Sequence, residues 1–262
     1  MDNKYKENVL IVGFGITGRN VYKELESLKP DIYDKDNSKY PDNYVGRHIK
    51  YGFIFICVDT PYINAQNPCD ISSVFDVINT WKDYLVPDGI MVLKSTVLPY
   101  QLSTIQYVVP QEKFVYSPEF YGNTQHCNNF EFNYTILGGN KLACYETQQL
   151  LQKVHDARHQ FRITDASTAA LAKYMENCYL ATKVSFCNQF ANICELESIN
   201  YEDVRELFIL DPRVNPSHTF VYKDKPYWDT HCLNKDVRAI AETYNAELIN
   251  DVIKFNNKSK RK

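Results

Sequence analysis

The segment at residues 8–28, "NVLIVGFGITGRNVYKELESL", constrains the fold of this chain more than any other stretch. Apolar residues 9–12 predict a buried strand, a glycine-rich turn follows, and the next residues have the apolar spacing of a helix. Gly13 permits a tight turn, Gly15 lets a ligand approach the backbone, and Gly18 lets the helix lie close to the strand. Strand, turn and helix in this order predict a dinucleotide-binding βαβ unit.

The start of the predicted helix and the end of the next strand supply further cofactor contacts. Ile16 and Thr17 open the helix, whose unsatisfied N–H groups would face the pyrophosphate. Asp34 follows Gly13 by about twenty residues, the distance at which an acid bonds the ribose 2′-hydroxyl. A carboxylate there repels a 2′-phosphate, so NAD is favoured over NADP, although Lys35 weakens the preference. The alternative is a glycine-rich turn without a ligand.

Strands and helices alternate through the first part of the chain. Continuous apolar runs are typical of strands buried in a parallel sheet, and apolar positions three or four apart are typical of helices. These patterns predict strands at 51–59, 89–96, 113–120 and 134–139 and helices at 70–85 and 102–109. We therefore predict an α/β fold with a doubly wound parallel-sheet dinucleotide-binding domain at 1–163, followed by a helical substrate-binding and dimerisation domain at 164–262.

Polar residues follow three of these strands, in "VDTP", "KSTV" and "SPEF". Ligands of open α/β sheets bind beyond the carboxyl ends of the strands, at one edge of the sheet. This position makes Thr60, Thr96 and Glu119 candidates for the cleft, with Val58 as a further cofactor contact. Each of them alone could equally be an ordinary turn or capping residue.

The hydrophobic period changes near Asp165. Residues 165–198 lack glycine and proline and predict one long helix or two nearly collinear ones, apolar on more than one face. We therefore predict a homodimer formed through this helix. Lys173 and Asn177 are four residues apart, so they lie on one side of the helix, where they need polar partners or a ligand unless that side is solvated. Further helices are predicted at 201–210 and 236–258.

Composition excludes several classes of function. The formal net charge of -3 gives no electrostatic reason to expect a nucleic-acid partner. The longest apolar runs, such as residues 53–58, are too short to span a membrane, and the N-terminus is too polar for a signal peptide. The 8 cysteines form neither a zinc motif nor a disulfide framework. We expect a cytoplasmic protein with reduced, mostly buried thiols.

One cysteine lies in unusual company, in "WDTHCLNKDVRAI" at residues 228–240. Cys232 is close to a histidine, a lysine and two carboxylates, which suits a nucleophile. Because free cysteine is among the most buried residue types, a small apolar filler is the alternative.

Seven motifs in order give the chain a resemblance to the nucleotide-sugar 6-dehydrogenases, the UDP-glucose and UDP-N-acetylmannosamine dehydrogenase family. They are "VGFGITG", "ICVDTP", "KSTVLP", "SPEF", "AKYMENCYLATKVSFCN", "LDPRV" and "CLNKD". The resemblance implies NAD-dependent oxidation of a sugar C6 alcohol to the carboxylate in polysaccharide biosynthesis, through a cysteine thiohemiacetal and thioester. The implied substrate is a nucleotide sugar.

The resemblance also implies roles for the candidate residues. Cys232 matches the family's nucleophile, and Asp236 matches the acid that activates water, helped by Thr96. Lys173 matches the cation that stabilises the oxyanion, and Asn177 matches a hydrogen-bond donor to the substrate.

Three further positions match residues near substrate or cofactor in the family. Glu119 corresponds to the acid of the "PEF" motif near the reacting centre, and Lys235 to a cofactor contact. Arg213 in "DPRV" corresponds to an arginine that reaches the substrate across the dimer interface.

The chain also departs from the family's pattern. "PYWDTH" stands where the family has a glycine-rich "GYGG" turn, Asn123 stands where a second acid is common, and an arginine is missing before "ILGG". The third, C-terminal domain of the family is not expected in this chain. These departures keep two alternatives open: a catalytically impaired homologue that binds NAD or a sugar nucleotide as a regulatory or assembly partner, and a simple two-electron alcohol dehydrogenase.

Overall fold

The computed structural model describes residues 5–36, 38, 50–121 and 132–261. Asn123 lies outside these residues. The chain divides into two compact units: unit 1 comprises Met1–Pro61, Cys69–Phe120 and Phe132–Lys173, and unit 2 comprises Tyr62–Pro68, Tyr121–Glu131 and Tyr174–Lys262. The proposed division between residues 163 and 164 remains a prediction.

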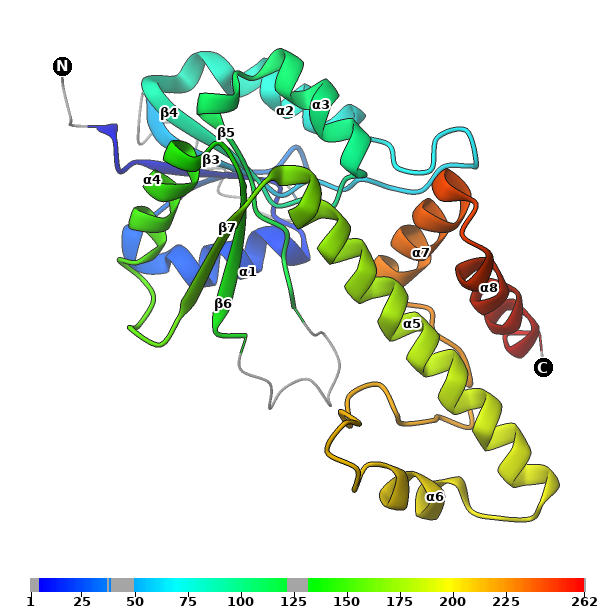
Figure 1. The fold of residues 1–262 in the computed structure, drawn as a ribbon. Helices are drawn as coiled ribbons and strands as arrows, with labels where there is room; N and C mark the ends of the chain where they lie inside the picture. Colours follow the sequence, from blue (N-terminus) through cyan, green and yellow to red (C-terminus); the bar gives the residue numbers. More distant parts are fainter. Residues whose placement is uncertain (1–4, 37, 39–49, 122–131, 262) are drawn as a thin grey trace. The chain divides into compact units, whose positions relative to one another are not determined.

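Unit 1 is built on a seven-stranded sheet with the order β2-β1-β3-β4-β5-β6-β7. The chain moves from β1 to β2 on one side and then crosses to β3 on the other, which places a topological switch point between β1 and β3. Figure 1 shows the sheet, with β3 to β7 labelled. The strands are β1 (Val9–Val12), β2 (Asp31–Tyr33), β3 (Tyr51–Ile56), β4 (Leu85–Leu93), β5 (Phe114–Tyr116), β6 (Tyr134–Gly139) and β7 (Gln160–Thr164).

The predicted doubly wound sheet is confirmed, with one exception in strand direction. β5 and β6 pair antiparallel, whereas the other neighbouring strands pair parallel. Parallel neighbours need a long crossover, usually a helix. No helical pattern separates the strands predicted at 113–120 and 134–139, so the expectation of a parallel pair there was wrong for a reason visible in the sequence.

Helices cover both faces of the sheet. α1 (Ile16–Leu25) and α4 (Lys141–Leu151) pack on one face, and α2 (Ser72–Trp81) and α3 (Pro99–Val108) pack on the other. Short 3-10 helices η2 (Glu26–Leu28), η3 (Lys82–Tyr84) and η4 (Gln111–Lys113) follow three of them. α4 and β7 were not identified in the sequence.

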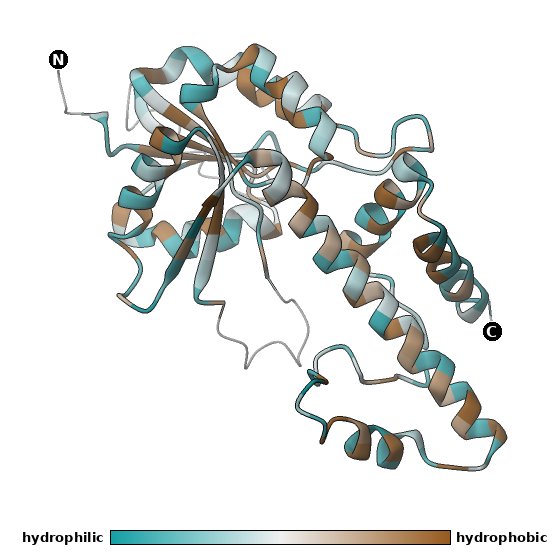
Figure 2. Cartoon of the chain, in the orientation of Figure 1, coloured by the Kyte–Doolittle hydropathy of each residue, from teal (hydrophilic) through white to brown (hydrophobic). Residues whose placement is uncertain are grey.

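The central strands are apolar because both of their faces are covered. In β3, Phe53 and Phe55 face the α1/α4 layer, and Ile54 and Ile56 face the α2/α3 layer. The apolar colouring of the central strands follows this burial (Figure 2). Full burial of one such side chain stabilises a fold by about 1.5–3 kcal/mol. Burial therefore holds these strands in place, and with them the edge of the sheet where the polar residues that follow the strands lie.

Unit 2 is helical. It contains α6 (Tyr201–Phe208), α7 (His231–Tyr244), α8 (Glu247–Ser259) and the greater part of α5 (Ala166–Leu196). α5 is one continuous helix, and Asp165 caps its start by accepting a hydrogen bond from the Thr168 backbone N–H at 2.8 Å.

The single closing helix predicted at 236–258 is wrong. Asn245 adopts a left-handed conformation, with φ of 47°, that ends α7 before α8 begins. Asparagine tolerates this conformation better than most residues, and its backbone N–H bonds the Ala241 carbonyl. Helix periodicity on both sides concealed the break.

Within the described residues, no helix has both the length and the apolar character needed to cross a membrane. The cytoplasmic location remains a prediction.

Candidate active site

The glycine turn has the geometry that the sequence predicted. Gly13 has a φ of 94°, and a Cβ there would lie 2.6 Å from the Cys57 carbonyl oxygen. A Cβ at Gly18 would lie 1.9 Å from the Gly13 carbonyl oxygen, so the start of α1 can approach the turn only without a side chain. Gly15 faces open space, with no atom within 4 Å of its Cβ position among the described residues. The turn is therefore close-packed at Gly13 and Gly18, whereas its backbone at Gly15 is accessible to a ligand.

Asp34 holds this turn in place. Its Oδ2 accepts a hydrogen bond from the Phe14 backbone N–H at 2.6 Å, and its Oδ1 accepts one from the Asp36 N–H at 2.8 Å. The residue is 6% exposed. The carboxylate that was predicted to select NAD thus lies beside the turn that would hold the pyrophosphate.

The N-terminus of α1 suits an anion. Gly15 is its N-cap and, among the described residues, no side chain caps the helix. Ile16 is 59% exposed, and Thr17 is half-buried. Helix N-termini that no side chain caps bind phosphate groups through backbone N–H groups and the helix dipole. The residues of unit 1 therefore fit a dinucleotide.

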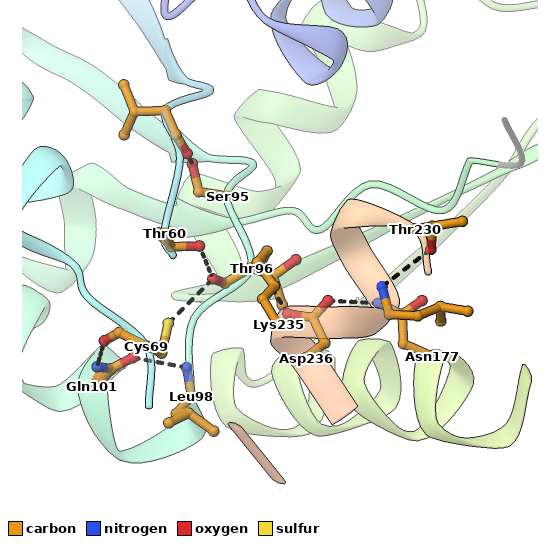
Figure 3. Close-up of polar contacts among 12 residues, drawn as sticks. Thr60, Cys69, Ser95, Thr96, Leu98, Gln101, Asn177, Thr230, Lys235 and Asp236 are labelled. Carbon is orange, nitrogen blue, oxygen red and sulfur yellow. Dashed lines mark hydrogen bonds and ion pairs between the residues drawn. The ribbon is translucent and has the colours of Figure 1, made fainter. Parts of the chain in front are cut away.

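The ends of β3 and β4 are tied together by side chains (Figure 3). The Thr60 hydroxyl donates to the Thr96 carbonyl oxygen at 2.6 Å, and the Ser95 hydroxyl donates to the Val58 carbonyl oxygen at 2.6 Å. Gln101 adds a bond from its Nε2 to the Cys69 carbonyl oxygen at 2.6 Å. Thr60 thus has a structural role at the sheet edge, and its contact with the cofactor remains a prediction, as does that of Val58.

Glu119 is paired with a lysine that sequence reasoning missed. Lys94 Nζ lies 3.0 Å from Glu119 Oε2, and the Lys94 side chain is 6% exposed. The signal was present in β4, where Ile90 and Val92 face the α1/α4 layer and Lys94 comes next in the same alternation. A lysine at a buried position needs a partner of opposite charge.

Lys173 lies against an aromatic ring. Its Nζ is 4.9 Å from the centroid of Phe120, the residue after Glu119, and Lys173 is 7% exposed. A cation over an aromatic face is stabilised by the ring quadrupole. Asn177 is 4% exposed, so the alternative of a solvated face is wrong for both Lys173 and Asn177.

Two side chains of unit 2 contact one buried carboxylate, that of Asp236 (Figure 3). Asn177 Nδ2 donates to Asp236 Oδ2 at 2.6 Å, and Lys235 Nζ lies 2.7 Å from Asp236 Oδ1. Asp236 is 1% exposed. An ionised carboxylate at such a position is stable because both of its oxygens have donors. Lys235 therefore bonds Asp236 in this structure, and its predicted cofactor contact remains a prediction.

Cys232 is exposed, whereas the other described cysteines are buried. It lies in the first turn of α7, where the Thr230 hydroxyl caps the helix by accepting from the Leu233 N–H at 3.3 Å. A helix N-terminus stabilises negative charge such as that of a thiolate. By contrast, burial raises the pKa of Cys178 to about 12. The interpretation of Cys232 as a buried apolar filler is therefore wrong.

Trp228, in the segment that replaces the glycine turn of the resembled family, is part of the core of unit 2. It is 4% exposed and packs with Cys178, and its Nε1 donates to the Ser185 hydroxyl at 3.1 Å. The Asn256 side chain bonds both the N–H and the carbonyl oxygen of Trp228, at 2.9 and 3.0 Å. The bulk of this side chain is thus accommodated between α5 and α8.

Arg213 pairs with a neighbouring carboxylate in the sequence. Its side chain is 88% exposed and forms an ion pair with Asp211 at 2.6 Å. Its predicted contact with substrate across a dimer interface remains a prediction. Among the described residues, no group of three or more histidine, cysteine or acidic side chains could hold a metal ion.

Comparison with known proteins identifies the same family along most of the chain. Residues 24–157 match the NAD binding domain of the UDP-glucose/GDP-mannose dehydrogenase family, and residues 167–258 match its central domain. The first of these matches confirms NAD as the expected cofactor.

Two curated relatives illustrate the range of the match. The UDP-N-acetyl-D-mannosamine dehydrogenase of Methanococcus vannielii is 29% identical over 209 residues, covering 78% of this chain and 47% of the relative. The UDP-glucose 6-dehydrogenase of Rickettsia prowazekii is 27% identical over 227 residues, covering 83% of this chain and 50% of the relative. The chain therefore spans about half the length of these relatives.

A solved structure of UDP-D-ManNAc dehydrogenase from Pyrococcus horikoshii has the same fold, with a TM-score of 0.78 and 19% identity. The superposition covers 96% of this chain and 68% of that one.

Proposed function

Because this chain belongs to the UDP-glucose/GDP-mannose dehydrogenase family, we propose that it oxidises the C6 alcohol of a nucleotide sugar to the carboxylate. The observation that carries the proposal is the arrangement on α7. An exposed thiol at Cys232 lies one helical turn from Asp236, a buried carboxylate held by Asn177 and Lys235. Residues four apart on a helix lie on the same side. A nucleophile and a base are thus presented together.

The residues of unit 1 that would hold NAD are the glycine turn at 13–18 and Asp34. When bound, NAD supplies the hydride acceptor for two successive two-electron oxidations, from alcohol to aldehyde and from aldehyde level to acyl level. The turn and the capless start of α1 would position its pyrophosphate, and Asp34 would accept a hydrogen bond from its ribose.

The chain's own residues perform the remaining steps. As the C6 hydroxyl releases its proton to water, the Lys173 ammonium stabilises the negative charge that develops on the C6 oxygen of the sugar. The Cys232 thiolate adds to the aldehyde carbon, forming a C–S bond, and the carbonyl oxygen takes up a proton. Oxidation of this thiohemiacetal gives a thioester on Cys232. The sugar cannot leave as a reactive aldehyde while that bond persists.

Release of the product requires water. Asp236 accepts a proton from water as the oxygen attacks the thioester carbonyl, the C–S bond breaks, and the Cys232 thiol is restored. Asn177 and Lys235 fix the Asp236 carboxylate for this role. Thr96 and Glu119, at the sheet edge, are proposed to assist through the position of the water. The retention of all these side chains does not favour an impaired homologue.

The experiment that tests the function is a screen of nucleotide sugars with NAD, following NADH absorbance. The names of the relatives make UDP-glucose and UDP-N-acetylmannosamine the first candidates. We expect NADH with at least one of them. Measurable NAD binding without NADH from any nucleotide sugar would contradict the proposal.

We also propose that the chain forms a homodimer through α5. A row of exposed apolar side chains follows one side of this helix. A contiguous exposed apolar surface marks a site where another molecule binds. Its members are Leu171, Met175, Tyr179, Phe186, Phe190, Ile193 and Leu196. Arg213 would then reach the substrate of the partner subunit.

A charged side chain in this row is expected to separate the two copies. Met175 is 73% exposed, so Met175→Glu leaves the fold of one copy intact but requires burial of a carboxylate in the interface. Sedimentation equilibrium should give a dimer for the parent and a monomer for the variant. Tyr107→Glu, at a 93% exposed position on α3, is the control. A monomeric parent would contradict the proposal.

A further inference from the structure

Asn256, on α8, has a buried polar side chain to which the mechanism above gives no role. It is 4% exposed, and both the oxygen and the nitrogen of its amide form hydrogen bonds. Its Oδ1 accepts from the Trp228 backbone N–H at 2.9 Å, and its Nδ2 donates to the Trp228 carbonyl oxygen at 3.0 Å. One side chain thus satisfies both backbone polar groups of a buried residue that lies 28 positions earlier in the chain.

The backbone held in this way leads directly into the helix that carries the proposed nucleophile. Residues 228–230, here called the entry segment, end at Thr230, which is the N-cap of α7. Cys232 follows in the first turn of that helix. Because Asn256 holds the first residue of the entry segment, the place where the chain enters α7 depends on the two hydrogen bonds of its amide.

Side chains of the entry segment make further short contacts with the helices around it. The Trp228 indole N–H donates to the Ser185 hydroxyl on α5 at 3.1 Å. The Asp229 Oδ1 accepts from Asn234 Nδ2 on α7 at 2.7 Å, and it lies 3.0 Å from the Nζ of Lys260, the C-cap residue of α8. The entry segment is therefore tied to α5, α7 and α8, all of which belong to unit 2.

α8 is itself packed into the core of unit 2, so Asn256 is carried by a fixed element. Val252, one helical turn before Asn256, is buried in a cluster with Trp228 and Leu233. The amide group of asparagine is planar, with an acceptor and a donor in fixed relative directions. Two hydrogen bonds from one such group fix both the position and the direction of the Trp228 backbone, whereas a single bond would allow rotation about it.

We propose that Asn256 is a positioning residue that fixes the entry segment and thereby the place of the Cys232 thiol at the start of α7. The inference deepens the proposed function, on which its catalytic consequence rests. A reacting group that is misplaced by about 1 Å can lower the rate by about a hundredfold. A buried side chain that holds the backbone before Cys232 therefore affects the rate of the chemical step.

Selective labelling follows the contact directly, because the chain has only 2 tryptophans, Trp81 and Trp228. NMR of ¹⁵N-tryptophan protein reports the exchange of their backbone N–H groups with heavy water, and Trp81→Phe assigns them. In Asn256→Ala the Trp228 N–H loses its buried acceptor, so we expect its exchange to be faster by about tenfold or more. The N–H of Trp81, in unit 1, should keep its parental rate. Unchanged exchange at Trp228 would overturn the inference.

The start of α7 is followed separately by mass spectrometry of hydrogen exchange. A peptide that covers residues 230–236 contains the Leu233 N–H, which donates to the Thr230 hydroxyl. It should exchange faster in Asn256→Ala, whereas a peptide from α6 should exchange at its parental rate. If Asn256→Ala fails to fold, Asn256→Leu fills the space without either hydrogen bond and must give the same accelerations. Parental exchange of the 230–236 peptide in the variant that folds would also overturn the inference.

The matched control removes another buried asparagine of the same unit. Asn188, on α5, is also 4% exposed, and its Nδ2 donates to the Val184 carbonyl oxygen of the same helix at 2.9 Å. Asn188→Ala should therefore leave the exchange of the Trp228 N–H unchanged. Equal acceleration at Trp228 in Asn188→Ala and Asn256→Ala would contradict the inference, because the effect would then be a general loosening of unit 2.

Activity measurements separate this inference from the proposed function. If the parent oxidises a nucleotide sugar, kcat should fall by about 10–100-fold in Asn256→Ala, with the Kd for NAD unchanged, and should keep its parental value in Asn188→Ala. If exchange at Trp228 accelerates but the parent forms no NADH, the proposed function fails and the hold of Asn256 on the entry segment stands. If the parent is active and Asn256→Ala keeps the parental kcat, the function stands and the positioning role fails.

Discussion

Replacing Cys232 with serine is expected to lower kcat for the complete oxidation by at least about a thousandfold, as when a catalytic nucleophile is removed. A serine hydroxyl at the start of α7 lacks the thiolate's nucleophilicity at neutral pH and cannot form the thioester. The ratio of NADH to consumed sugar should fall from two to at most one. Absorbance at steady state, together with product analysis, measures both quantities.

The matched control is Cys194→Ser, which alters a buried cysteine of the same unit. It should retain the ratio of two with a modest loss of stability. Full activity in Cys232→Ser would show that the exposed thiol takes no part in the chemistry.

Replacing Asp236 is expected to affect both stability and product release. Asp236→Ala leaves the Lys235 ammonium, which is 13% exposed, and the buried Asn177 amide without their shared acceptor. Removing one partner of a buried ion pair costs about 3–5 kcal/mol. We expect a loss of about 3 kcal/mol in the free energy of unfolding, measured by urea denaturation. Asp251→Ala breaks the exposed pair with Lys254 on α8 and should cost less than about 1 kcal/mol. Equal losses in the two variants would contradict the account.

Asp236→Asn isolates the chemical role, because the amide oxygen can still accept from Asn177. Without a base for water, thioester hydrolysis should slow by about 10²–10⁴-fold, and NADH should appear as a burst followed by a slow phase. Stopped-flow absorbance resolves the two phases. A single phase at the parental rate would remove Asp236 from the mechanism.

Local spacing in the sequence was sufficient to predict the geometry of the glycine turn, beside which Asp34 lies. The glycine turn and Asp34 are fixed by backbone requirements that a short segment expresses fully: Gly13 needs a positive φ, and Gly18 needs the absence of a Cβ. The hydrophobic alternation that places Lys94 inside unit 1 was also present, and reading it through the end of β4 would have found the lysine.

The rest depended on contacts between distant residues. Asn177 and Asp236 are 59 residues apart, and no local pattern states that the amide of one meets the carboxylate of the other. Cys232 is exposed because it lies in the first turn of α7, and the N-cap residue Thr230 determines where that helix begins. Thr230 was a usable signal for this helix start, because threonine is a common N-cap residue. The helix was instead predicted from the apolar residues that follow, and its predicted start at residue 236 was too late.

The direction of β6 and the break at Asn245 were missed for different reasons. The sequence has no helical pattern between the strands at 113–120 and 134–139, which was a usable signal for an antiparallel pair. At Asn245, by contrast, the apolar pattern of a helix continued across the point where α7 ends. Hydrophobic periodicity records which side chains are buried, and it contains little information about strand direction or a single left-handed residue. Asn245 itself was the better signal, because asparagine adopts that conformation at low cost.

The central claim is that Cys232 carries the sugar as a covalent acyl group between the second oxidation and hydrolysis. Mass spectrometry of Asp236→Asn, quenched in acid after incubation with NAD and the active nucleotide sugar, tests it most directly. The account predicts that the peptide containing Cys232 gains the mass of the oxidised nucleotide sugar and loses it on treatment with hydroxylamine. NADH formation with the Cys232 peptide unmodified, or with the adduct on another residue, would contradict it.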